Sequence, residues 1–219
     1  MSYSILEERL IKRSFQLGLA ICGIIGPILF TIVLITLGFL HPGYNHITQY
    51  MSELGAVNAP YANIKNTGLF IVGALIAFFS FGMYIDLNDK KTKATMIGSS
   101  LIFISGISFL LIGFFPCDPD CINFTTIGMI HGYLANTAQF PLIIAPYFLL
   151  TSFKIYKKWD SIYYYSIISI ILVVTSFAVY KSHIFEGYVG LLQRISFGIP
   201  ILWVEIIAIK IFKSNLFES

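Results

Sequence analysis

The polar residues best suited to chemistry in this 219-residue chain lie within or beside short stretches between long apolar runs. They include all four histidines, several acids and one isolated arginine: His41, His46, Glu53, Asp118, Asp120, His131, His183, Glu186 and Arg194. Ionisable side chains inside a membrane are rare enough that each one is a candidate functional residue. We therefore expect these residues to gather on one side of a membrane and to line a polar cavity open to that side.

Three functions are compatible with this group. In the first, Arg194 and His131 bind an anionic group, such as a lipid headgroup phosphate or a carboxylate, for binding or transport. In the second, the protein is a membrane-embedded hydrolase, with Ser52 or a water as nucleophile, His131 as base and Arg194 stabilising the oxyanion. In the third, the polar residues only tie helices together. No HExxH, GxSxG or phosphate-binding glycine loop is present to favour catalysis.

Two cysteines, Cys117 and Cys121, lie in one short connection with prolines and aspartates. A disulfide between them is the simplest interpretation if this connection is outside the cytoplasm. A zinc site that adds Asp118 and Asp120 is the alternative, although structural zinc sites usually show a second Cys or His pair at regular spacing. We predict no metal and no cofactor, because a haem ligated on both sides needs intramembrane histidines at matching depth and only His131 lies inside a span.

The elements that position these residues follow from composition. The chain is 57% hydrophobic and 11% charged, with a mean hydropathy of +0.80, whereas about a quarter of the residues of soluble domains are charged. We predict an all-α integral membrane protein with a single domain over residues 1–219. Its six spans are each long enough to cross a bilayer, which needs ~20 residues of helix, and cover roughly residues 15–40, 64–85, 94–115, 126–153, 162–180 and 188–212.

The basic residues are distributed unevenly between the two sets of connections. Eleven of the fourteen fall on the side of the termini: Arg9, Lys12, Arg13, Lys90, Lys91, Lys93, Lys154, Lys157, Lys158, Lys210 and Lys213. The other side has only Lys65, Lys181 and Arg194, each within or beside a span. The positive-inside rule then predicts a multi-pass protein of the cell membrane with cytoplasmic N- and C-termini. The net charge of +3 needs no nucleic-acid partner, because these residues also contact anionic membrane lipids.

The first outer connection carries the densest polar sequence. We predict a short interfacial helix over residues 45–54, capped by Asn45 and ended by Gly55. Its apolar stripe contains Ile47, Tyr50, Met51 and Leu54. The predicted helix covers a cavity lined by polar groups from spans two, four and six.

Several motifs spread over most of the chain resemble one known family. They are ITQYMSELG at residues 47–55, APY at 59–61, GFFPCD at 113–118, HG at 131–132, and GLLQR at 190–194 with Trp203. In these motifs the chain resembles the DUF998 membrane proteins. The resemblance implies a bacterial or archaeal multi-span helical protein without an established activity. It adds weight to five candidate ligand-binding residues, namely Ser52, Glu53, Asp118, His131 and Arg194.

Overall fold

The computed structural model describes residues 3–87, 92–155, 157–182 and 184–217, with the side chains described from residue 7 onward. Six long α-helices dominate: α1 (Tyr3–Leu40), α2 (Ala62–Leu87), α3 (Lys93–Ile112), α4 (Thr126–Ile155), α5 (Asp160–Lys181) and α6 (Val189–Phe217). Each contains a segment long and apolar enough to cross a membrane. The predicted all-α class and the six membrane-spanning helices are therefore confirmed, and no strand occurs in the described parts of the chain.

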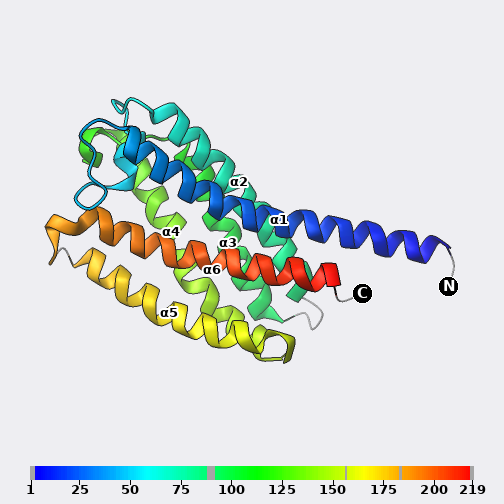
Figure 1. Ribbon diagram of the computed structural model, residues 1–219. Helices are drawn as coiled ribbons and strands as arrows, with labels where there is room; N and C mark the ends of the chain where they lie inside the picture. Colours follow the sequence, from blue (N-terminus) through cyan, green and yellow to red (C-terminus); the bar gives the residue numbers. More distant parts are fainter. Residues whose placement is uncertain (1–2, 88–91, 156, 183, 218–219) are drawn as a thin grey trace.

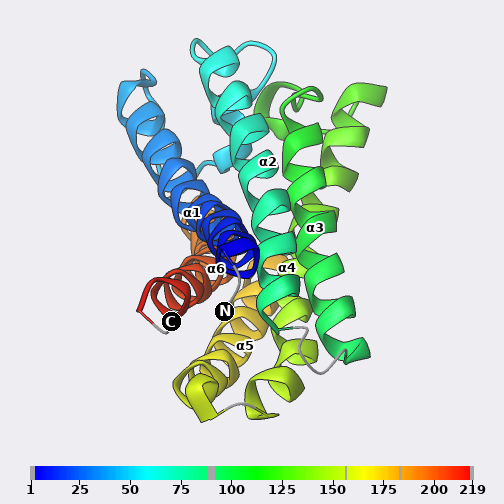
Figure 2. The ribbon, with the colours of Figure 1, turned by 90° about the vertical axis from the view of Figure 1, so that its right-hand side faces the viewer.

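The helices form a closed bundle in chain order. Each packs against the next along the chain, and α6 returns to pack against α1 (Figures 1 and 2). Gly73 and Gly106 allow the closest approach, because a Cβ atom on either would collide with the backbone of the facing helix, α3 or α2. Helix α5 lies at the edge of the bundle, since only 22% of its most apolar segment is buried.

The two ends of the bundle differ in character. Both termini lie at one end, and the connections 41–61, 113–125 and 182–188 lie at the other, which we call the loop end (Figure 1). At the terminus end, Arg13 Nε donates to the carbonyl of Asn215, and Asn215 Nδ2 donates to Asp86, which links α1, α6 and α2. Three short 3-10 helices belong to the loop end: η1 (Met51–Gly55), η3 (Pro119–Cys121) and η5 (Glu186–Tyr188). A fourth, η4 (Lys157–Trp159), precedes α5.

The helix predicted over residues 45–54 is replaced by a turn followed by η1. Asn45 caps the turn as expected, because its side-chain oxygen accepts from the backbone nitrogens of Ile47 and Thr48. The chain is then extended at Tyr50 (φ −65°, ψ 145°), whose N–H donates to the Glu53 carboxylate at 2.7 Å. That bond starts a new, shorter helix. As a result Met51 and Leu54 are buried, whereas Ile47 is 45% exposed and leaves the predicted apolar stripe.

Candidate functional site

An inner cavity lies beneath η1 at the centre of the bundle. Its polar lining consists of Ser52, Lys65, His131 and Gln193, and its apolar lining comes from α1, α2, α3, α4, α6 and Met51. The cavity has a volume of about 40 Å³, which is enough for a few water molecules. The cavity is therefore small, mostly apolar and polar at one side.

A second pocket, which we call the vestibule, leads toward the surface between α4, α5 and α6. It has a volume of about 190 Å³ and is lined by Tyr50, Cys121, Asn123, Asn136 and Lys181, among others. Ser52, His131, Ala135, Gln193 and Phe197 line both the vestibule and the inner cavity. These shared residues form the boundary between the two spaces.

Lys65 is the only cation of the inner cavity among the residues that line it, and the sequence did not predict it as a site residue. It lies in the first turn of α2, where its side chain is only 2% exposed. Within the described parts of the chain its ammonium group makes no hydrogen bond or ion pair. The sequence does show a lysine just inside an apolar span. It does not mark Lys65 as a site residue, because a lysine at that depth usually extends its ammonium group to the membrane surface.

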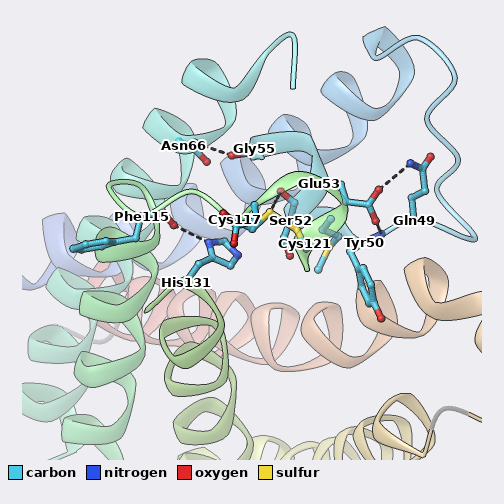
Figure 3. The surroundings of a disulfide bond; sticks show 12 residues. Gln49, Tyr50, Ser52, Glu53, Gly55, Asn66, Phe115, Cys117, Cys121 and His131 are labelled. Carbon is cyan, nitrogen blue, oxygen red and sulfur yellow. Dashed lines mark hydrogen bonds between the residues drawn. A yellow bond between two sulfur atoms is a disulfide. The ribbon is translucent and has the colours of Figure 1, made fainter. Parts of the chain in front are cut away.

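His131 is held in one orientation by a hydrogen bond to the backbone of the connection between α3 and α4. Its Nδ1 lies 2.8 Å from the carbonyl oxygen of Phe115 (Figure 3). Because a carbonyl only accepts, Nδ1 carries the hydrogen and the Nε2 of a neutral ring keeps its lone pair. His131 is 5% exposed and lines both cavities, so it is a buried base beside Ser52 and Lys65.

The loop between Cys117 and Cys121 contacts both η1 and the vestibule. In the structure Cys117 and Cys121 are joined as a disulfide (Figure 3). Cys117 Sγ lies 3.3 Å from the carbonyl oxygen of Ser52, and the Val57 N–H donates to the carbonyl of Cys117. Cys121 lines the vestibule, so the loop connects η1 to the rim of that pocket.

Asp118 holds the two residues that precede helix α4. Its carboxylate accepts from the backbone nitrogens of Phe124 and Thr125 at 3.0 and 2.9 Å and from the Thr125 hydroxyl at 2.7 Å. Burial raises the pKa of this carboxyl, but the hydrogen bonds from Thr125 and Phe124, with His131 nearby, outweigh burial and hold the pKa below its usual value. These bonds account for Asp118 without a ligand.

Arg194 and Glu53 also have partners within the chain. Arg194 Nη1 donates to the carbonyls of His46, Gln49 and Gly190 at 2.7, 3.1 and 2.9 Å, and its Nη2 donates to the Tyr44 hydroxyl. Glu53 accepts from Tyr50 and from the Gln49 side chain. Both residues therefore organise the first connection.

Gly190 allows α6 to approach that connection. A Cβ atom there would collide with the backbone of Gln49 and with the His46 carbonyl. The Leu191 N–H donates to the carbonyl of Ile47 at 3.0 Å, which adds a backbone bond to those of Arg194. Nearby, burial and the Arg194 charge lower the pKa of His46, whose Nε2 has no partner in the described part of the chain.

Of the predicted site residues, the structure brings Ser52 and His131 together at the inner cavity and adds Lys65 and Gln193. His183 lies outside the described residues. Asp120 is exposed beside the disulfide, and Glu186 is exposed at the start of η5. Gln139, deeper in α4, donates to the Ser196 hydroxyl of α6 below the vestibule.

The described residues contain no group of three His, Cys, Asp or Glu side chains arranged to hold a metal ion. The zinc alternative requires the free thiolates of Cys117 and Cys121, which the disulfide removes in this structure.

A family model described as a protein of unknown function (DUF998) matches residues 24–210. The chain belongs to the DUF998 family. The region matched in this DUF998 protein begins within α1 and ends within α6, so it contains both cavities and all three loop-end connections. No curated protein and no solved structure matches the chain.

Proposed function

We propose that this DUF998 membrane protein binds a small anionic group, a carboxylate or a phosphate, in the inner cavity, with Lys65 as the counter-ion. The observation that carries the proposal is the buried Lys65 ammonium group without a partner in the described residues. Removing a charged ammonium from water costs several kcal/mol unless an opposite charge and hydrogen bonds compensate it. An anion from outside the chain supplies both.

The neighbouring groups suit the same ligand. The Ser52 hydroxyl can donate to an anion, and a neutral His131 can accept through Nε2 from a protonated acid or a bound water. Gln193 uses its side-chain oxygen to accept from the Met51 N–H at 2.7 Å, and its amide group also bonds to the Tyr180 hydroxyl. The second amide hydrogen can donate to a ligand. Three kinds of donor thus surround a space large enough for a carboxylate.

The vestibule provides a route for an anion from the aqueous side. Lys181 lies at its rim and donates to the Asn136 side chain at 3.2 Å. A cation at the mouth of a low-dielectric pocket raises the local concentration of anions. We assign the loop end to the outer side of the cell membrane, because most lysines and arginines belong to the side of the termini.

The hydrolase alternative is less well supported. Ser52 and His131 line the same cavities, but no hydrogen bond joins their side chains within the described residues. A serine nucleophile needs a base within about 3 Å to remove its proton. The purely structural alternative accounts for Arg194 and Asp118, but it leaves the buried charge of Lys65 unexplained.

The test compares wild type with Lys65→Met in phosphatidylcholine nanodiscs. The melting temperature of each protein is measured in sodium acetate, in sodium phosphate and in sodium chloride as the reference, all at equal ionic strength. We expect at least one of the two anions to raise the melting temperature of the wild type. We expect Lys65→Met to lose this effect, with an affinity at least tenfold lower. Without ligand the variant should melt no lower than wild type, because replacing an uncompensated buried charge by an apolar side chain removes its desolvation cost.

Lys93→Met is the matched control, since Lys93 is exposed at the other end of the bundle and lies far along the chain from the cavity. It should keep the full response to the anion. The proposal fails if Lys65→Met responds to acetate and phosphate as wild type does, or if neither anion stabilises the wild type.

A further inference from the structure

An apolar groove runs between α1 and α6 and faces away from the bundle axis. It has a volume of about 230 Å³, and its walls include Thr31 and Ile35 on α1 and Gly198, Ile201 and Leu202 on α6. Ile35 and Leu202 are 49% and 50% exposed. On a helix pair that spans a membrane, such a face contacts the hydrocarbon of the lipids.

The groove is separated from the inner cavity by only a few side chains. Phe30, Leu34 and Met51 line both spaces. Methionine is unbranched and rotates about three bonds, so Met51 can change shape without a backbone movement. The inner cavity is therefore adjacent to the polar vestibule on one side and to a lipid-facing groove on the other.

The ends of the groove bear opposite charges. Arg194 lines it toward the loop end and Glu205 lines it toward the terminus end. Arg194 is already bonded to three carbonyls and to Tyr44, and Glu205 repels an anion. The groove between them is suited to an apolar chain, while the available counter-charge for an anionic head is Lys65 in the cavity behind Phe30, Leu34 and Met51.

We propose that the ligand is a fatty acid, with its carboxylate on Lys65 and its acyl chain in the groove between α1 and α6. This inference rests on the proposed function. A carboxylate is smaller than a phosphate group and carries a single negative charge, whereas a phosphate group carries about −1.5 to −2 at pH 7. It therefore suits a small cavity of about 40 Å³ that has one cation, Lys65, among its lining residues. The acyl chain enters from the lipid by displacing Met51, and the vestibule keeps the carboxylate accessible to water.

Gly198→Phe tests the groove directly. Gly198 lines the groove, and a Cβ atom there meets no atom within 4 Å, so a larger side chain fills the groove without disturbing the helix packing. Gly18→Phe is the matched control, because Gly18 on α1 also has open space around it and is exposed. The probes are hexadecanoate, hexadecyl phosphate and acetate, measured for binding to the full chain in phosphatidylcholine nanodiscs.

We expect wild type and Gly18→Phe to bind hexadecanoate alike and Gly198→Phe to bind it at least tenfold more weakly. Acetate should bind all three equally, because it has no chain to occupy the groove. Lys65→Met should lose both hexadecanoate and acetate. If Gly198→Phe does not fold, Ile35→Trp fills the groove from α1 and should give the same pattern.

Two results would overturn the fatty-acid assignment and leave the anion site intact. In the first, Gly198→Phe binds hexadecanoate as tightly as wild type does. In the second, wild type binds hexadecyl phosphate more tightly than hexadecanoate. A third, hexadecanoate binding that Lys65→Met does not change, overturns the placement of the carboxylate. Failure of acetate and of both long-chain probes to bind wild type would instead overturn the proposed function itself.

Discussion

Arg194 and Lys65 are two cations within the spans that differ in what surrounds them. Arg194 is enclosed by carbonyl oxygens and a tyrosine hydroxyl from the first connection and its own helix. Lys65 lines a cavity in which the described residues offer its ammonium group no hydrogen bond. The arginine thus stabilises the loop end, while the lysine is available to a ligand.

Replacing Arg194 by lysine should lower stability and leave ligand binding intact. A lysine has one nitrogen and cannot reproduce the four bonds of the guanidinium, so carbonyls of His46 and Gln49 lose a partner. We expect a loss of about 1–3 kcal/mol in the free energy of unfolding, the usual cost of unsatisfied buried polar groups. Chemical denaturation in nanodiscs, with Arg9→Lys on the exposed start of α1 as control, measures it.

If Arg194 instead binds the ligand, Arg194→Lys would abolish the acetate or phosphate response while melting like wild type. That result would return Arg194 to the role that the sequence first suggested.

The sequence singled out His131 and Ser52 as candidate site residues but not Lys65, which lines the same cavity. The rarity of a histidine inside an apolar run marks it directly, because few structural roles require one there. A lysine near the end of a span is common, and only the three-dimensional packing of η1 over α2 decides that Lys65 is enclosed. The sequence left open whether Arg194 binds an anionic group or only ties helices together. In the structure its guanidinium bonds to three carbonyls and to the Tyr44 hydroxyl.

At the scale of elements, the helices were predictable and the first connection was not. Length and hydropathy determine a membrane span, so the six predicted ranges agree with α1 to α6 to within a few residues at most ends. The exception is α1, which extends back to Tyr3. The segment 45–54 was predicted as one helix. In the structure the Glu53 carboxylate accepts from the Tyr50 N–H, and this bond starts the shorter helix η1 instead. Hydrogen bonds between a side chain and the nearby backbone compete with helix formation, and they leave no periodic pattern in the sequence.

The Asp118 carboxylate, which holds the residues just before α4, gives a pH-dependent prediction. The folded-state pKa of Asp118 lies below its unfolded value, so its contribution to stability is present above the unfolded pKa, about 3.9, and is lost as the pH falls through the lower folded value. Asp118→Asn should therefore melt below wild type at pH 7, and the gap should narrow below pH 4. Melting curves from pH 3 to 7 test this.

Asp120→Asn is the control for that series, because Asp120 is exposed in the same loop. It should follow wild type at every pH. If the difference in melting temperature between wild type and Asp118→Asn stays constant or widens toward pH 3, the charge of the carboxylate does not stabilise the segment before α4.

At the scale of the whole molecule, both termini lie at one end of the ring of helices (Figure 1). Both cavities lie closer to the other end, because residues of the first connection line them. A ligand that reaches Lys65 from water therefore approaches from the loop end, and under the fatty-acid proposal a ligand that comes from lipid passes between α1 and α6. The orientation of the bundle decides which aqueous compartment supplies the ligand.

Single cysteines introduced at the two ends test that orientation. Asn58→Cys at the loop end should react with a membrane-impermeant maleimide added to intact cells, whereas Lys93→Cys should react only after the cells are opened. The native cysteines contribute little background, because Cys22 lies within α1 and Cys117 is bonded to Cys121. The reverse labelling pattern would put the loop end in the cytoplasm and contradict the positive-inside assignment.

The central claim is that Lys65 holds an anion from outside the chain. Native mass spectrometry of the protein extracted with its own lipids measures this directly, comparing wild type, Lys65→Met and Lys93→Met. We predict an acidic adduct of defined mass on wild type and Lys93→Met that is absent from Lys65→Met. An adduct of equal abundance on all three proteins, or none on any of them, would contradict the account.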